Sequence, residues 1–339
     1  MKKILSVLLC LALGAGVLAG CSHQEEPSPT PSPSPEVSQV ASEPYKIGLV
    51  QYQEHGELDS LREAFMSRLE EWGCDEDRVE IDYQNAEGDP VKAEEICDTF
   101  VKDDVDMIVA ISTPAAKAAA QAVAGTQVKV VFTGVSDQEA LGLEEGTSSS
   151  SQVTGVVSPT PVGDLLALAQ QADSTLKTLG LLYDPSDPGA LAVIEDVKAA
   201  CGEKGLEVAE ATVSSQEEVA QAMTELCGRV DAVFTPPDNT VAPMAAEAAQ
   251  AAKTAQVPWY TSWDAMVQSG ALAAMGVTGR EMGVKAADMA VELMEGRELS
   301  QVPVYTFESP STFVNQTTLT ALSSLTFPTE VLQSAFVYQ

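Results

Sequence analysis

The chain has 339 residues, of which 45% are hydrophobic and 5% aromatic, and its 50 acidic and 18 basic residues give a formal net charge of −32. This length is enough for two domains, each with its own core. The charge argues against nucleic acid as a partner, because binding phosphates needs a basic face.

The first 20 residues have the layout of a targeting segment. Lys2 and Lys3 precede an apolar stretch from Ile4 to Val17, which is too short to predict a membrane span. The stretch ends in "LAGC" (18–21), which is similar to a bacterial lipobox and predicts lipidation of Cys21 after cleavage. The alternative is an ordinary secretory signal with a chance cysteine. Residues 21–44, rich in Ser and Pro, predict an extended tether between the lipid and a folded body.

The remaining cysteines indicate neither a cofactor nor a metal. Cys74, Cys97, Cys201 and Cys227 contain no CxxC pair, and His23 and His55 are the only histidines, which argues against zinc. The pairs Cys74–Cys97 and Cys201–Cys227 are conceivable disulfides outside the cell, and four unpaired thiols are the alternative.

From Tyr45 onward, strand-like and helix-like runs alternate. Apolar, β-branched runs at 45–52, 79–86, 105–112 and 128–137 are separated by helical patterns, such as the one in which Leu58, Leu61, Phe65 and Leu69 recur at helical spacing. Strands separated by helices predict βαβ units and a parallel sheet, and therefore an α/β fold.

This series of runs is then repeated. The runs at 178–184, 206–213, 229–240 and 257–264 resemble those at 46–52, 79–86, 104–115 and 129–137, in the same order and at an offset of about 125–132 residues. The repeat predicts two lobes of like topology. The carboxyl ends of their strands are expected to face a shared cleft, where open parallel sheets bind ligands.

The turns after the strands contain none of the motifs GxxxxGK[ST], GxGxxG and GxSxG, which argues against a nucleotide-binding protein and against a serine hydrolase. The polar residues at these strand ends predict a binding site for a small molecule. In the first lobe, Ser112, Thr113 and Pro114 open an alanine-rich helix whose N-terminus suits an anion, although a simple helix cap is the alternative. In the second lobe, Asp238 and Asn239 suit a cation. The two together predict a zwitterion such as a free amino acid, with Asp238 contributing most.

Further candidate ligand-binding residues follow the other strands of the two lobes. They are Gln51, Tyr52, Glu54, His55, Thr133, Val135, Asp137, Thr160, Tyr183, Thr261 and Trp263. The aromatic members suit a flat or apolar ligand side chain, and an ordinary core position is the alternative for each.

The motifs at these strand ends resemble those of a known family, the tryptophan/tyrosine-binding branch of substrate-binding lipoproteins of ABC importers. Its patterns Q-x-x-E-H-x-x-L-D, IDYQNAxGD, IVAIATPAA and VDAIYVPTDNT are matched by "QYQEHGELD" (51–59), "IDYQNAEGD" (81–89), "IVAISTPAA" (108–116) and "VDAVFTPPDNT" (230–240). The chain departs from the family at 261–270, where "TSWDAMVQSG" replaces the usual "SEEG", so the preferred ligand side chain can differ.

The resemblance implies a type I periplasmic-binding-protein fold, with two Rossmann-like lobes joined by three crossings. The expected lobes are 45–157 plus about 278–301, and 158–277 plus about 302–339. It implies a non-catalytic monomer that binds an aromatic or apolar amino acid and delivers it to a permease and its ATPase. The expected location is the outer side of a bacterial membrane, held by lipid. A sensory protein of the same fold is one alternative, and a secreted hydrolase using His55 as base is another.

Overall fold

The computed structural model describes residues 43–143 and 152–339. The targeting segment, Cys21 and nearly all of the tether lie outside the described residues. Within the described residues, no helix combines the length and the apolar character needed to cross a bilayer.

The first lobe is built on a six-stranded parallel sheet with the order β11-β5-β4-β3-β1-β2. Its strands are β1 (Tyr45–Gln51), β2 (Val79–Asn85), β3 (Met107–Ile111), β4 (Lys129–Val135), β5 (Val153–Val157) and β11 (Tyr305–Thr306). All five residues of β3 and of β5 are buried, as expected for strands covered by helices on both faces.

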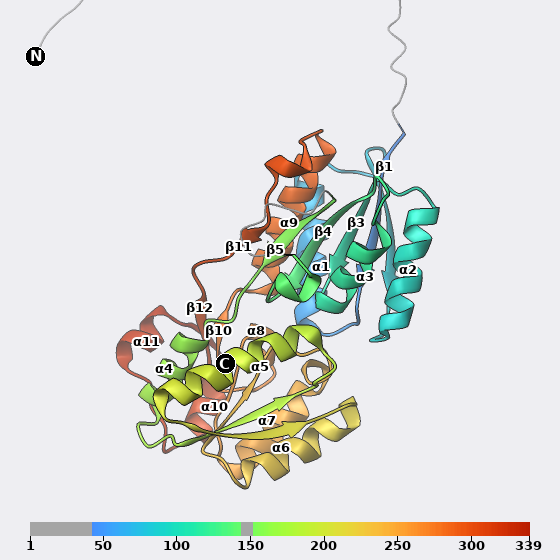
Figure 1. Ribbon diagram of the computed structural model, residues 1–339. Helices are drawn as coiled ribbons and strands as arrows, with labels where there is room; N and C mark the ends of the chain where they lie inside the picture. Colours follow the sequence, from blue (N-terminus) through green and yellow to red (C-terminus); the bar gives the residue numbers. More distant parts are fainter. Residues whose placement is uncertain (1–42, 144–151) are drawn as a thin grey trace, which may run out of the picture. The chain divides into compact units, whose positions relative to one another are not determined.

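Helices cover both faces of this sheet (Figure 1). One apolar cluster joins the sheet to α1 (Gly56–Glu71) and α9 (Gly279–Met294), and another joins it to α2 (Pro90–Lys102) and α3 (Thr113–Ala122). A short 3₁₀ helix, η1 (Glu139–Leu141), follows β4. Both faces of the sheet are therefore apolar, which explains why the strands appear in the sequence as continuous apolar runs.

The second lobe is built on a seven-stranded sheet with the order β13-β12-β10-β9-β8-β6-β7, in which only the β10–β12 pair is antiparallel. Its strands are β6 (Thr178–Tyr183), β7 (Glu207–Thr212), β8 (Ala232–Thr235), β9 (Trp259–Thr261), β10 (Ala273–Gly276), β12 (Ser311–Asn315) and β13 (Phe336–Tyr338).

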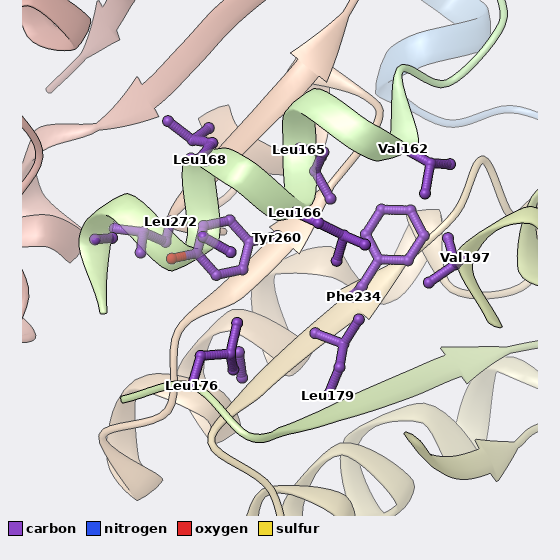
Figure 2. Packing of buried hydrophobic residues seen from close by; sticks show 14 of the residues in the cluster. Val162, Leu165, Leu166, Leu168, Leu176, Leu179, Val197, Phe234, Tyr260 and Leu272 are labelled. Atoms are coloured by element: carbon purple, nitrogen blue, oxygen red, sulfur yellow. The ribbon is translucent and has the colours of Figure 1, made fainter. Parts of the chain in front are cut away.

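Two helical layers cover this second sheet. One consists of α4 (Val162–Ala172), α5 (Pro188–Lys204) and α10 (Gln316–Ala321), and the other of α6 (Val219–Cys227), α7 (Ala245–Ala255) and α8 (Asp264–Gln268). Figure 2 shows how Leu165 and Leu166 of α4 lie over Phe234 of β8. The remaining elements are η2 (Gln216–Glu218), η3 (Ala242–Met244), η4 (Leu299–Gln301) and α11 (Thr329–Ser334).

The two sheets share one topology over their first five strands. The order β2-β1-β3-β4-β5 in the first lobe corresponds to β7-β6-β8-β9-β10 in the second. The predicted α/β fold with two lobes of like topology is therefore confirmed. The chain passes between the lobes three times, after β5, after β10 and after β11.

The last crossing lies later in the chain than the sequence suggested. The expected second lobe resumed at about residue 302, but Tyr305 and Thr306 pair with Val156 and Val157 and extend the first sheet. A two-residue strand carries no detectable periodicity, and it forms here because it covers the otherwise unpaired edge of β5.

Helix α9 returns from the second lobe and packs closely on α1. A Cβ atom at Gly283 would lie 2.2 Å from the carbonyl oxygen of Leu61, and one at Gly279 would lie 2.8 Å from that of Glu57. The two glycines lie one helical turn apart, so the backbones of α1 and α9 approach each other along one stripe. The four cysteines of the two lobes, Cys74, Cys97, Cys201 and Cys227, are free and buried, so the structure favours unpaired thiols.

Candidate functional site: the strand-end loops

The loops that follow β1 and β3 in the first lobe meet the loop that follows β8 in the second. Asn239 is the centre of this contact. Its Nδ2 donates to Oγ of Ser112 at 3.1 Å, and its Oδ1 lies 3.3 Å from Nε2 of His55. Its backbone carbonyl accepts a hydrogen bond from the side chain of Gln53. Three side chains of the first lobe therefore converge on one residue of the second.

Asp187 holds Asn239 in place from within the second lobe. Oδ2 of Asp187 accepts hydrogen bonds from Nδ2 of Asn239 at 2.6 Å and from its backbone N–H at 3.1 Å. Oδ1 of Asp187 accepts from the N–H groups of Gly189 and Ala190 and so caps the start of α5. One carboxylate thus fixes both a helix start and the amide at the lobe contact.

Ser112 does not act as a helix cap, although it precedes α3. Its side chain makes no capping hydrogen bond, Pro114 lies in the first turn, and its backbone has φ 90° and ψ 153°. This region is populated almost only by glycine, and a serine there costs about 1–3 kcal/mol. Oγ of Ser112 instead accepts the hydrogen bond from Asn239, so the cap alternative does not describe this residue.

We expect Ser112→Gly to raise the free energy of unfolding by about 1 kcal/mol, because glycine adopts this φ without strain and the lost hydrogen bond offsets part of the gain. Ser112→Ala keeps the strain and loses the hydrogen bond, so it should lower the free energy of unfolding. Urea denaturation of the two variants measures both effects. If glycine were no more stable than alanine at this position, the strained backbone would be the wrong explanation.

Thr113 and Asp238, predicted to hold the two charged ends of a ligand, do not belong to the lining of the cavity described below. Thr113 faces Gly189, since a Cβ atom at that glycine would lie 2.7 Å from Oγ1 of Thr113. Asp238 is fully buried, and its carboxylate accepts hydrogen bonds from the N–H groups of Asp184 (2.6 Å), Thr240 (2.9 Å) and Val241 (2.9 Å). The pair across the contact is Ser112 with Asn239, and Asp238 holds the shape of its own loop.

Asp184, Asp187 and Asp238 form an acidic cluster in the second lobe. All three are at most 6% exposed, and among the described residues none forms an ion pair with Lys or Arg. Burial, together with the charge of Asp187, raises the pKa of Asp238 to about 7, and burial also raises the pKa of Asp187. These shifts favour the protonated carboxyl, and a cation bound beside the cluster would favour the ionised form instead.

The acidic cluster borders a cavity of about 410 Å³ between the strand-end loops. Asp184, Asp187 and Asn239 line it from the second lobe, and Tyr52, Pro114 and Lys117 line it from the first. The hydroxyl of Tyr52 donates to the carbonyl of Gly88 at 2.7 Å, which fixes the ring as one wall. The volume suits a ligand the size of an amino acid.

A second cavity, of about 770 Å³, is lined by Ser136, Asp137, Thr160 and residues of α5. The side chain of Asp137 accepts from the N–H of Glu139 at 2.8 Å, and Thr160 donates to Oγ of Ser262 at 3.0 Å. Thus Asp137 and Thr160 lie at a lobe boundary, but away from the acidic cluster.

His55 is buried at the same contact and is electrically neutral at neutral pH. Burial lowers the pKa of His55 to about 4, against opposing effects of Asn239 and Asp59. Its ring lies beside that of Trp263, with centroids 5.3 Å apart and planes tilted by 33°. Its Nδ1 atom is buried and has no hydrogen-bond partner among the described residues.

Other predicted residues lie under the site or away from it. The side chain of Gln51 donates to the carbonyl of Gln53 and to Asp59, and so supports the first loop. Thr133 donates to the carbonyl of Met282, and Thr261 donates to Sδ of Met266, both in the interior. Val135 belongs to the apolar core, and Glu54 is exposed.

Tyr183 is a core residue and not a wall of the site. Its ring is buried in the cluster beneath α4 and α5, and its hydroxyl donates to Glu210 at 2.6 Å. Its position at a strand end made it a candidate, but the alternation of side chains along β6 directs it to the core face.

Sequence reasoning missed Gln53, Asp184 and Asp187. The last two lie in "DPSDP" (184–188), where an aspartate precedes a proline directly after a strand. Asp before Pro at a helix start is a recognised capping pattern, so this signal could have located the second strand-end loop. Among the described residues, no group of three or more His, Cys, Asp or Glu side chains could hold a metal ion.

Glu57 is a buried acid close to this contact, in the first turn of α1. It is 1% exposed, and neither carboxylate oxygen has a hydrogen-bond partner among the described residues. Burial raises the pKa of Glu57 well above its usual range, and the nearby carboxyl of Asp264 raises it further, while the N–H groups of Ala265 and Gly279 act in the opposite direction.

We expect Glu57→Gln to stabilise the fold increasingly as pH rises. A carboxyl whose pKa is higher in the folded than in the unfolded state stabilises the fold below the unfolded pKa of about 4.3, and this contribution is lost as pH rises toward the folded pKa. Glutamine does not titrate, so the gain over the original chain should be larger at about pH 8 than at about pH 5. Urea denaturation at both pH values, with the exposed Glu70→Gln as control, measures it. Equal differences at the two pH values would contradict the expectation.

Two mostly parallel sheets of like topology, each covered by helices, are joined by three crossings, and their strand-end loops meet around a cavity. This arrangement defines a type I periplasmic-binding-protein fold. The sequence profile of the family described as "ABC transporter substrate binding protein" matches residues 46–338, and the chain belongs to this family. The resemblance found in the sequence motifs is thereby confirmed.

Similar proteins carry names that describe binding. A tyrosine-binding protein of Clostridioides difficile (strain R20291) is 31% identical over 324 residues, which cover 95% of this chain and 92% of that protein. A Streptococcus pneumoniae ABC domain in complex with L-Trp is 30% identical with a TM-score of 0.81, covering 87% of this chain and 100% of that one. The ligand-free, open structure of a substrate-binding protein with adhesive properties from Clostridium difficile is also 30% identical, with a TM-score of 0.66 and coverage of 87% and 99%.

Proposed function

We propose that this substrate-binding protein takes up a free amino acid, preferably an aromatic one, in the cavity between its strand-end loops and delivers it to an ABC permease. It is held outside the membrane through lipid on Cys21, acts as a monomer and catalyses no reaction. The observation that carries the proposal is the buried acidic cluster of Asp184, Asp187 and Asp238, which has no balancing cation among the described residues.

The α-ammonium group of the ligand lies against this cluster. Asp184 and Asp187 line the cavity, whereas Asp238 lies behind them and adds its charge. Hydrogen bonds between charged partners contribute about 1.5–3 kcal/mol, and a desolvated site makes the attraction stronger than it is in water. An ammonium ion therefore supplies the positive charge that the cluster lacks.

The α-carboxylate of the ligand lies toward the first lobe. The start of α3 offers N–H groups that have no acceptor within the helix, and Lys117 on the same helix lines the cavity. With the acids on one side and the helix start with Lys117 on the other, the cavity is complementary to a zwitterion, so a bound amino acid contacts both lobes. A ligand that contacts both lobes favours the closed arrangement.

The side-chain preference is supported by Tyr52 and by the relatives. The fixed ring of Tyr52 gives a flat wall against which an aromatic side chain can stack. Two proteins of about 30% identity are described as tyrosine-binding and as a complex with L-Trp. The hydrolase alternative finds less support, because Oγ of Ser112 is bonded to Asn239 and not to His55.

Isothermal titration of the full chain with the twenty amino acids tests this proposal. We expect the tightest binding from tyrosine or tryptophan, and we expect binding to be lost when the α-amino group is acetylated or the α-carboxylate is converted to an amide. Absence of binding by every free amino acid would overturn the proposal, and equal binding of the acetylated ligand would refute the role of the acidic cluster.

A further inference from the structure

Glu57 and Asp264 bring two buried carboxyl groups together from different lobes. Glu57 lies in the first turn of α1 and Asp264 in that of α8, and their side chains are 1% and 6% exposed. The two helices meet at this point, since a Cβ atom at Gly56 would lie 3.6 Å from the Cβ of Ala265. The carboxyl of Asp264 acts directly on that of Glu57. The pair therefore spans the boundary between the lobes.

These two carboxyl groups can form a hydrogen bond only through a proton. Neither carboxylate oxygen of Glu57 has a partner among the described residues, and an ionised carboxylate only accepts hydrogen bonds. Asp264, in contrast, accepts from Nε2 of Gln268 at 2.9 Å and from the hydroxyl of Tyr338 at 2.7 Å, which stabilises its negative charge. A proton on Glu57 makes this residue the donor that Asp264 can accept from. The lobe contact thus holds one proton between two carboxyl groups.

No basic side chain offers either carboxyl group another partner. Among the described residues, neither forms an ion pair with Lys or Arg. His55, just before α1, is neutral at neutral pH because burial lowers its pKa to about 4. The elements η3 and β3, which also contact α1, contain no titratable residue.

Other charged groups on α1 and α9 are exposed or engaged elsewhere. They are Arg280 and Glu281, which are exposed, Asp59, which pairs with Arg62, Lys285, which lies over the ring of Tyr305, and Asp288, which pairs with Arg68. Loss of the proton therefore leaves two negative charges facing each other in a buried place, without a cation to compensate them.

We propose that Glu57 and Asp264 form a proton-dependent latch between the lobes. With one proton between them, the pair holds the closed arrangement. When this proton is released to solvent at higher pH, the two negative charges repel each other and the open arrangement is favoured. The inference rests on the proposed function, because it takes the two lobes to open and close on a ligand. A ligand that selects the closed arrangement is then bound more weakly as pH rises.

The direction of the pH effect follows from the two environments of Glu57. In the open arrangement its carboxyl meets water, where the ordinary pKa is about 4.3. In the closed arrangement burial and the carboxyl of Asp264 raise the pKa of Glu57 well above that value, although the N–H groups of Ala265 and Gly279 oppose this. The latch therefore contributes fully below about pH 4.3, and its contribution is lost as pH rises toward the pKa of the closed arrangement.

Isothermal titration of the full chain with its preferred amino acid tests the latch at about pH 5 and about pH 8. Glu57→Gln is the decisive variant, because glutamine can donate to Asp264 at both pH values. From the lower to the higher pH, we expect the dissociation constant of the original chain to rise at least about 10-fold more than that of this variant. Titration of Asp187 and Asp238 is common to both proteins and cancels in the comparison. Glu70→Gln, an exposed change on the same helix, should behave like the original chain.

Small-angle X-ray scattering of the ligand-free full chain gives a readout that needs no ligand. We expect the radius of gyration to increase from about pH 5 to about pH 8 in the original chain and in Glu70→Gln, but not in Glu57→Gln. If no amino acid binds and the scattering still behaves in this way, the proposed function fails and the latch stands.

Other results refute the latch and leave the receptor function standing. They are an equal change of the dissociation constants of the original chain and Glu57→Gln between the two pH values, or the same pH dependence of their scattering. If the free energy of unfolding of Glu57→Gln still showed the pH dependence described above, Glu57 would be buried in both arrangements and would not control the closure of the lobes.

Discussion

Replacing both Asp184 and Asp187 by asparagine is expected to weaken binding of the preferred amino acid about 100-fold or more, with each single change costing about 10-fold. The two carboxylates line the cavity and, with Asp238, have no Lys or Arg partner among the described residues. Removing their charge removes the attraction for the ligand's ammonium group. Isothermal titration of the variants measures the loss.

Structural side effects of these two substitutions can be separated from the loss of charge. Asparagine remains a good helix cap, so Asp187→Asn should retain the start of α5. Glu203→Gln, an exposed charge change near the end of the same helix, should leave the affinity unchanged. Dissociation constants within about twofold of the original for a folded double variant would contradict the assignment of the ammonium subsite.

Gly283→Val is expected to lower the free energy of unfolding by at least about 3 kcal/mol. A Cβ atom at this position would lie 2.2 Å from the carbonyl oxygen of Leu61 and 3.0 Å from the Cβ of Ala64, so α9 could not remain against α1. Because backbone atoms are in the way, rotation of a side chain cannot relieve the clash.

The matched control for this second prediction is Gly202→Ala in α5. Nothing lies within 4 Å of a Cβ at Gly202, so alanine should stabilise the helix by about 0.5–1 kcal/mol. Urea denaturation of both variants measures the two effects. If Gly283→Val unfolded at the same urea concentration as the original chain, the close packing of α1 and α9 would be contradicted.

Most of the fold could be predicted from the sequence because its strands are buried on both faces. Such strands appear as uninterrupted apolar runs, and their order recurs in the second lobe at a nearly constant offset. The short strands β11 and β13 could not be predicted in this way. Two or three residues give no periodicity, and the position of β11 is determined by the free edge of a strand nearly 150 residues away.

The sequence predicted which loops meet at the site, but it did not predict which residues of these loops contact one another. The sequence indicated that the loops after β1, β3 and β8 carry polar residues, and the structure brings these loops together at Asn239. The sequence could not indicate that the loop after β8 turns back around Asp238. As a result, the carboxylate of Asp238 accepts hydrogen bonds from N–H groups of its own lobe. The roles of neighbouring residues such as Asp238 and Asn239 are decided by turn geometry, which one sequence does not reveal.

The structure shows what the segment 261–270, where the sequence differs from the family pattern, contacts in the fold. In this segment, Trp263 packs beside His55, and Asp264 accepts hydrogen bonds from Gln268 and from the hydroxyl of Tyr338. The segment therefore places the ring of Trp263 beside His55, and a hydrogen bond from Tyr338 to Asp264 connects it to β13, the last strand. A change of ligand preference between this chain and its relatives is expected to arise here.

The most direct test of the account is a crystal structure of the full chain with L-tyrosine, or with L-tryptophan if that binds more tightly. The account predicts the ligand between the strand-end loops, its ammonium group within hydrogen-bonding distance of Asp184 or Asp187 and its carboxylate at the start of α3. A ligand bound elsewhere, or one whose ammonium group faces the first lobe and makes no contact with the acidic cluster, would contradict it.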